Sequence, residues 1–159
     1  MSYEVQVKNV DGGAIMGIRG RARRDNMPQV IRQLFDQFYA DPPPGIPRGL
    51  NIVFYEYYGK QSETAEGIPL ICGVQIDAPF SGHGKVVAAS TPPGRVAMVT
   101  HWGPYSELNR AYTAIDQWGH AQEKPLTSDT IFAGPSWEVY GHHNDNPAKL
   151  QTDVYKLLA

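Results

Sequence analysis

The sequence has little cysteine, little excess charge and no long hydrophobic run. Its 159 residues include one cysteine, Cys72, which rules out an internal disulfide and cannot by itself build a cysteine-rich zinc site. The formal net charge is -2, so the chain lacks the positive excess that holds proteins on a phosphate backbone. We therefore expect no direct nucleic-acid partner, no metal and no other cofactor.

No stretch approaches the ~18 consecutive apolar residues of a membrane-spanning helix. The opening MSYEVQVKNV also lacks the basic start and the apolar run of a secretory signal. We therefore expect a soluble, cytoplasmic protein without a membrane partner. The length suits one domain over residues 1–159, because a chain of this size buries roughly two thirds of its unfolded surface.

Aromatic residues are the one enrichment, at 11% with nine tyrosines. Aromatic side chains suit the walls of a pocket for flat ligands, and they suit a hydrophobic core equally well. The adjacent pair His142 and His143 carries less information. On a strand the two imidazoles point in opposite directions, so the pair predicts a solvated turn rather than a metal site.

The first half of the chain alternates between strand and helix periodicity. Alternating apolar positions predict strands over residues 3–10 and 14–20, joined by a glycine turn. Helical spacing then predicts a helix that starts near Asn26 and ends before the proline-rich stretch 41–49. The β-rich runs 51–59 and 70–76 predict a second pair of strands.

The second half repeats this order. We predict strands over 85–90 and 95–102, a helix over 103–119, a strand over 137–141 and a closing helix over 147–158. Two short matches support a duplication: FDQF at 35–38 resembles IDQW at 115–118, and YEYYG at 55–59 resembles WEVYG at 137–141.

The predicted fold is therefore α+β, with duplicated strand-helix-strand halves over about 1–80 and 84–159. A pseudo-twofold axis would relate these halves. Their strands would join in one antiparallel sheet with the helices packed on one face, and a ligand cleft would lie between the halves.

Glu138 interrupts an otherwise apolar strand. Alternation places Trp137 and Val139 on one face, which we expect to pack against the helices, and Glu138 and Tyr140 on the other. The matching strand of the first half also carries a glutamate two residues before a tyrosine. The side chains that we expect to share its face and to line the same cleft are Phe54, Glu56 and Tyr58.

A carboxylate within an aromatic rim attracts cationic or amphipathic ligands through charge pairing and cation–π contacts. The alternative is structural. An outward glutamate is most often solvated, and an inward one is most often paired with a nearby arginine, here Arg19, Arg21 or Arg95.

Four stretches in this order resemble the GyrI-like small-molecule-binding domain, which also forms the effector-binding half of AraC-type and MerR-type activators. They are GGAIMGIRG (12–20), LICGVQI (70–76), GRVAMVTHWGPYSELNRAY (94–112) and GPSWEVYG (134–141). The resemblance covers nearly the whole chain. It implies a ligand cleft between the halves, with Glu138 facing the drug pocket, Tyr140 beside it, and Trp102 and Tyr105 nearby.

The resemblance implies a protein that binds aromatic, cationic or amphipathic molecules for sensing or sequestration. Activators of this kind carry a helix-turn-helix before the domain, whereas this chain enters its first strand within a few residues of Met1. We therefore expect a stand-alone binder, which would need a separate protein partner to act as a regulator.

Two other functions are compatible with the same resemblance. The first is hydrolysis of reactive cyclopropane-bearing genotoxins, with Glu138 as the general base. The second is modulation of DNA gyrase through protein contact.

Overall fold

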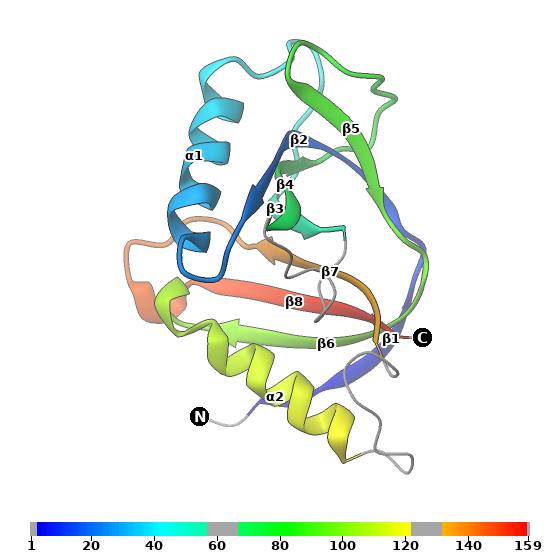
Figure 1. Ribbon diagram of the computed structural model, residues 1–159, viewed down its shortest axis with the longest axis vertical. Coiled ribbons are helices and arrows are strands. Elements are labelled where there is room, and N and C mark those ends of the chain that lie inside the picture. The colour runs from blue at the N-terminus through cyan, green and yellow to red at the C-terminus, as the bar shows by residue number, and fades with distance from the viewer. Residues whose placement is uncertain (1–2, 57–66, 122–131, 159) are drawn as a thin grey trace.

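The computed structural model of the protein describes residues 3–56, 67–121 and 132–158. In these ranges the chain forms eight strands and two α-helices (Figure 1). The strands are β1 (Gln6–Val10), β2 (Gly13–Ala22), β3 (Asn51–Tyr55), β4 (Ile68–Gln75), β5 (Val86–Thr91), β6 (Gly94–Trp102), β7 (Phe132–Tyr140) and β8 (Gln151–Leu158). The helices are α1 (Met27–Ala40) and α2 (Asn109–His120), with the 3₁₀ turns η2 (Tyr105–Glu107) and η3 (Pro147–Lys149).

The strands form one antiparallel sheet in the order β1-β6-β8-β7-β3-β4-β2-β5. Exchanging β1 with β5, β2 with β6, β3 with β7 and β4 with β8 reverses this order and leaves it otherwise unchanged. The sheet therefore has the predicted pseudo-twofold arrangement, and the central pair β3–β7 lies at the axis. The predicted α+β fold with an antiparallel sheet and duplicated halves is confirmed.

The predicted closing helix over 147–158 is wrong. Only the 3₁₀ turn η3 is helical there, and β8 follows it between β6 and β7. Leu150, Val154 and Leu157 fit a helical stripe, but the burial in β8 alternates, with Thr152 and Val154 buried. Tertiary pairing decides this segment, because β8 satisfies the backbone hydrogen-bonding groups of both neighbouring strands.

Both helices cover the face of the sheet that carries Glu138. Leu34 and Phe38 of α1 pack into a cluster with Val53, and Ile115 of α2 packs into a cluster with Val154. Val53 and Val154 lie directly opposite Glu138 on β3 and β8. Directly opposite residues of an antiparallel pair share a face, so Glu138 faces the helical layer.

The prediction that Trp137 and Val139 face the helices is therefore wrong. These side chains join Ile52 and Phe54 in a third cluster on the helix-free face. Figure 1 shows β2 and β5 running steeply across the view in which β6 and β8 lie nearly horizontal. A sheet twisted this strongly curls, and its concave face packs on itself without a covering helix.

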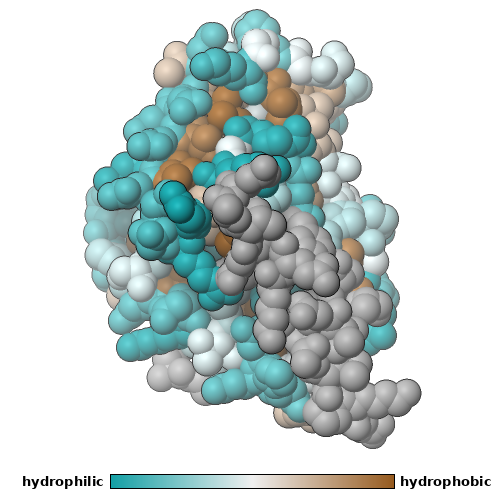
Figure 2. Space-filling model, viewed as in Figure 1, coloured by the Kyte–Doolittle hydropathy of each residue, from teal (hydrophilic) through white to brown (hydrophobic). Residues whose placement is uncertain are grey.

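Hydrophobic and hydrophilic residues occupy different parts of the surface around α1. Figure 2 shows hydrophobic residues in a strip between α1 and β5, while hydrophilic residues cover the outer side of α1. This distribution is expected of an amphipathic helix. Within the described ranges, no helix is long and apolar enough to cross a membrane.

Gly73 of β4 lies opposite Gly17 of β2, at a point where there is no room for a side chain between the two strands. A Cβ atom added at Gly73 would lie 1.9 Å from the carbonyl oxygen of Met16. We expect Gly73→Ala to lower the free energy of unfolding by about 3 kcal/mol, because main-chain atoms must move. Chemical denaturation measures this difference.

Gly13→Ala is the matched control, because the atom nearest to its added Cβ is the Thr91 hydroxyl oxygen at 3.8 Å. We expect this variant to stay within about 0.5 kcal/mol of the wild type. Equal stability of the two alanine variants would contradict the close approach of β2 and β4.

Candidate functional site

Glu138 is the one carboxylate in a row of side chains that crosses the centre of the sheet on the helical face. Its neighbours in the row are apolar or a thiol, and every member is at most 5% exposed. The row runs through Val99, Val154, Glu138, Val53, Cys72 and Ile18. Glu138 itself is only 3% exposed, so its carboxylate needs partners within the protein.

Tyrosine hydroxyls provide these partners. The Tyr140 hydroxyl donates to Oε1 of Glu138 at 2.5 Å, and the Tyr112 hydroxyl donates to Oε2. Hydrogen bonding from Tyr55 also acts on the carboxylate. Tyr140 follows Glu138 by two residues on β7, Tyr55 ends β3 and Tyr112 comes from α2. Three elements therefore converge on one carboxylate.

Burial sets the protonation behaviour of this group. Desolvation raises the pKa of Glu138 above its ordinary value, and hydrogen bonds from Tyr112, Tyr140 and Tyr55 oppose part of the rise. Burial and the nearby carboxylate raise the pKa values of Tyr112 and Tyr140 well above the ordinary tyrosine value. Both phenols therefore keep their protons at neutral pH and act as donors.

A cavity of about 800 Å³ opens onto Glu138 between α1 and the start of α2. Its floor is formed by Glu138 and its three tyrosine neighbours, Tyr55, Tyr112 and Tyr140. Apolar residues of α1 such as Ile31 line one wall. This volume lies within the range typical of ligand pockets, about 300–1,000 Å³.

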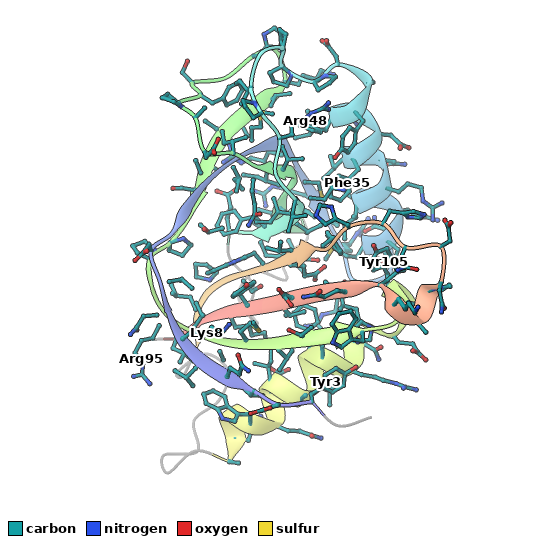
Figure 3. The ribbon with its side chains drawn as sticks, turned by 180° about the vertical axis from the view of Figure 1, so that it is seen from behind. Tyr3, Lys8, Phe35, Arg48, Arg95 and Tyr105 are labelled. Atoms are coloured by element: carbon teal, nitrogen blue, oxygen red, sulfur yellow. The ribbon has the colours of Figure 1, made fainter. Side chains whose placement is uncertain are left out.

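Aromatic rings form a second wall of the cavity. Phe35 of α1 and Tyr105 of η2 both contact the Tyr140 ring edge to face, with centroids 6.4 and 5.3 Å away. Figure 3 shows Phe35 and Tyr105 near one another on neighbouring elements at this end of the molecule. Edge-to-face contacts restrain these rings, so the wall is largely preformed.

His101 holds the turn that carries Tyr105 to the cavity. Its ring is 1% exposed, and Nε2 lies 3.1 Å from the Pro104 carbonyl oxygen. A carbonyl only accepts, so Nε2 carries the proton and Nδ1 accepts from the Tyr3 hydroxyl at 2.8 Å. These bonds tie Tyr3 near the N-terminus to the residue just before Tyr105.

The structure brings three of the predicted site residues to the cavity, namely Glu138, Tyr140 and Tyr105. Trp102 is 48% exposed and is not among the described residues that line it. Tyr58 lies outside the described residues.

Two predicted site residues lie elsewhere. Glu56 pairs with Arg19 at 2.8 Å, and both side chains are exposed. Phe54 packs against Trp137 on the helix-free face. The physical reason is register: Val53, not Phe54, lies opposite Glu138. Shifting a strand by one residue moves each of its side chains to the other face, so the matched glutamates of YEYYG and WEVYG do not share a cleft.

Sequence reasoning missed Tyr112, Tyr55 and Phe35 as cavity residues. Tyr112 lies in the predicted helix over 103–119, at a helical spacing from Leu108 and Ile115 that indicates packing. A buried tyrosine needs a partner for its hydroxyl, and this requirement was the signal that pointed toward the carboxylate. The structural alternative of an arginine partner applies to Glu56, whereas the hydrogen bonds described for Glu138 come from phenols.

The raised pKa of Glu138 makes a prediction about stability. A raised pKa means that the folded protein binds this proton more tightly than the unfolded chain. The associated stabilisation is present below the ordinary pKa of about 4.5 and is lost as the pH rises through the raised value. We expect Glu138→Gln to lack this loss, so its stability relative to the wild type should increase from pH 4 to pH 8 in urea denaturation.

Glu56→Gln removes an exposed carboxylate outside the cavity and is the matched control. We expect its free energy of unfolding to stay close to that of the wild type from pH 4 to pH 8. A constant difference between Glu138→Gln and the wild type across this pH range would contradict the proposed effect of burial on Glu138.

Comparison with known proteins agrees with this architecture. A family profile described as the GyrI-like small molecule binding domain matches residues 3–158. No curated protein sequence matches the chain. Among solved structures, the crystal structure of the EcmrR C-terminal domain is 16% identical with a TM-score of 0.73, and the match covers 100% of this chain and 99% of that one.

Three other similar structures are those of a protein–DNA complex, a complex with a cation and a hydrolase. In the EcmrR–DNA complex (15% identity, TM-score 0.72), the match covers 98% of this chain but only 57% of the EcmrR chain. SAV2435 bound to tetraphenylphosphonium is 10% identical with a TM-score of 0.69, covering 98% of this chain and 94% of that one. A hydrolase from Listeria innocua is 10% identical with a TM-score of 0.56, covering 98% and 92%.

Identities this low show a shared fold and nothing finer. The family profile, however, spans almost the whole chain. The protein therefore belongs to the GyrI-like family of small-molecule-binding domains.

Proposed function

We propose that the protein binds aromatic organic cations in the cavity above Glu138, for sensing or sequestration. The observation that carries this proposal is a carboxylate that is 3% exposed on the floor of a cavity of about 800 Å³. Its described hydrogen-bond donors are neutral phenols. Phenols stabilise the carboxylate but leave its negative charge in place.

A bound cation would neutralise that charge where water is excluded. Charge pairs and cation–π contacts are stronger in such a site than at the surface, because less solvent screens them. The rings of Tyr105, Tyr140 and Phe35 provide aromatic surface around the path to the carboxylate. The site therefore suits a ligand that is flat or lobed, apolar over most of its surface and positively charged.

One structural relative supports this ligand class. SAV2435 was solved with tetraphenylphosphonium, a large aromatic cation. Its fold covers nearly all of this chain, so the same ligand is a reasonable first probe here.

We expect Glu138→Gln to weaken binding of tetraphenylphosphonium by about 30-fold, or about 2 kcal/mol. Neutral triphenylphosphine oxide lacks the positive charge, and we expect its affinity to change less than threefold. Isothermal titration calorimetry at pH 7.5 measures both. Equal losses for the two ligands would show that the charge of Glu138 does not select the ligand.

Glu56→Gln is again the matched control, because it removes one carboxylate just after β3 without touching the cavity. We expect it to bind both ligands as the wild type does. A loss as large as that of Glu138→Gln would assign the effect to net charge rather than to the site.

Hydrolysis is the second candidate function. The raised pKa of Glu138 supports it, because a carboxylate with a pKa closer to neutrality is a better general base. Glu138 would take a proton from water as the water oxygen bonds to a strained ring carbon and the ring carbon–carbon bond breaks. The Tyr112 hydroxyl would supply the proton for the leaving carbon, and Glu138 would then pass its proton to the Tyr112 oxygen through the hydrogen bond between them, which restores both groups.

We expect this activity, if present, to convert an electrophilic cyclopropane into its ring-opened hydration product, heavier by one water. Mass spectrometry after long incubation detects that product. Loss of turnover in Glu138→Gln, with Glu56→Gln still active, would support general-base chemistry. Recovery of unchanged cyclopropane with the wild-type protein would eliminate it.

A further inference from the structure

Asn51 is a half-buried amide that lines the cavity at the start of β3. Strand alternation places its side chain on the helical face together with Val53 and Tyr55. Val53 lies directly opposite Glu138. Asn51 is therefore two residues, or about 7 Å, along β3 from the level of the carboxylate. An aromatic ligand that binds at Glu138 can thus also contact Asn51.

Asn51 differs from the other polar residues that line the cavity. The tyrosine hydroxyls of the floor already form hydrogen bonds with Glu138. The remaining polar residues of the described lining are exposed, namely Arg24, Arg32, Ser106, Asn109 and His143. An exposed group exchanges a water contact for a ligand contact with little net gain. Asn51 is therefore the described lining residue best suited to select among ligands by a hydrogen bond.

One branch of the Asn51 amide already has a hydrogen-bond partner. The hydroxyl of Tyr39, on α1, donates to Oδ1 of Asn51. Within the described part of the chain, the amide nitrogen Nδ2 has no acceptor. An amide nitrogen carries two donor hydrogens, so Nδ2 can donate to a ligand while Oδ1 keeps its bond to Tyr39.

Arg48 favours this direction of the hydrogen bond. Its guanidinium carbon lies 5.8 Å from the centroid of the Tyr39 ring. The phenol oxygen gains negative charge when the hydroxyl donates, and a nearby cation stabilises that charge. Tyr39 therefore donates to Oδ1 rather than accepting from Nδ2. An edge-to-face contact with the buried ring of Phe38, at 5.1 Å between centroids, restrains the Tyr39 ring.

We propose that Asn51 is a specificity-determining residue, and that the ligand is an aromatic cation with a hydrogen-bond acceptor one aromatic ring away from its charge. This inference rests on the proposed function and names the ligand class for the same site. The cationic centre would lie at Glu138, and Nδ2 of Asn51 would donate to the acceptor, such as a carbonyl oxygen. Tyr39 is a positioning residue, because it acts through the Asn51 amide.

The acceptor distinguishes this ligand class from purely apolar aromatic cations. A carbonyl group that leaves water loses its hydrogen bonds, and Nδ2 of Asn51 replaces one of them. An apolar substituent in the same place leaves Nδ2 without an acceptor, which is unfavourable for a half-buried donor. The site therefore discriminates between ligands of equal charge and similar shape.

Two phosphonium cations test this inference. The first, (p-acetylphenyl)triphenylphosphonium, carries a carbonyl acceptor, and the second, (p-isopropylphenyl)triphenylphosphonium, carries an apolar group of similar shape. Both have one positive charge, so the ratio of their affinities is insensitive to general changes in charge attraction. Isothermal titration calorimetry at pH 7.5 measures both affinities. We expect Asn51→Leu to lower the ratio of acetyl to isopropyl affinity about fivefold.

Three further variants separate the donor from other effects. Asn51→Asp keeps the shape and the acceptor for Tyr39 but removes both donors, so we expect the same ratio to fall about fivefold or more. Tyr39→Phe removes the hydrogen bond that orients the amide, and we expect a fall of about twofold. Asn109→Leu is the matched control, because Asn109 is an exposed amide of the same lining. It should leave the ratio unchanged.

Two results would overturn the inference: an unchanged ratio in Asn51→Leu and Asn51→Asp, or an equal fall in Asn109→Leu. If both Asn51 variants fail to fold, an unchanged ratio in Tyr39→Phe, which alters an exposed helix residue, would also overturn it. Failure of the proposed function has a different signature. In that case Glu138→Gln would leave the affinities for both cations unchanged, whatever the Asn51 variants do. Binding of neither cation by the wild-type protein would overturn both.

Discussion

Burial of the Glu138 carboxylate is the constraint on which the site depends. A carboxylate removed from water is unfavourable unless other donors replace its hydration. Here the donors are phenols from both halves of the fold, Tyr55 from the first and Tyr112 and Tyr140 from the second. The same hydrogen bonds therefore join β3, β7 and α2 around one charge. The phenols do not neutralise this charge, and the proposed binding of a cation depends on it.

A symmetric framework supports this asymmetric site. The sheet order reads the same from both halves, and β3 and β7 pair at its centre. Opposite Glu138 the first half places Val53, and opposite Tyr55 the second half places Ser136. Only β7 therefore contributes a carboxylate to the central pair. Residues of α1 and of the start of α2 line the cavity, and Glu138 is the one carboxylate among its described lining residues.

The rings around Glu138 have two roles. Tyr140 donates to the carboxylate through its hydroxyl and contacts Phe35 and Tyr105 through its ring. One side chain thus links the polar floor to the aromatic wall. His101 extends this link, because it fixes the turn before Tyr105. The orientation of the wall consequently depends on packing outside the cavity, as is typical of preorganised sites.

The sequence by itself determined the local elements and their duplicated order. Alternation and helical spacing predicted α1, α2 and most strands, because these patterns depend on neighbours close in the chain. It also singled out Glu138 and Tyr140, which alternation places on one face of a strand. For residues 147–158, by contrast, local helical spacing predicted a helix where the structure has β8.

Only the tertiary structure decided which face the helices cover, which register pairs β3 with β7, and which donors surround Glu138. Both faces of the central strands are apolar, so composition does not distinguish the helix-covered face from the curled one. A register shift of one residue exchanges the faces, and Phe54 and Glu56 were misplaced for this reason. Tyr112 reaches Glu138 across 26 residues of sequence, a distance over which only folding brings a hydroxyl to a carboxylate.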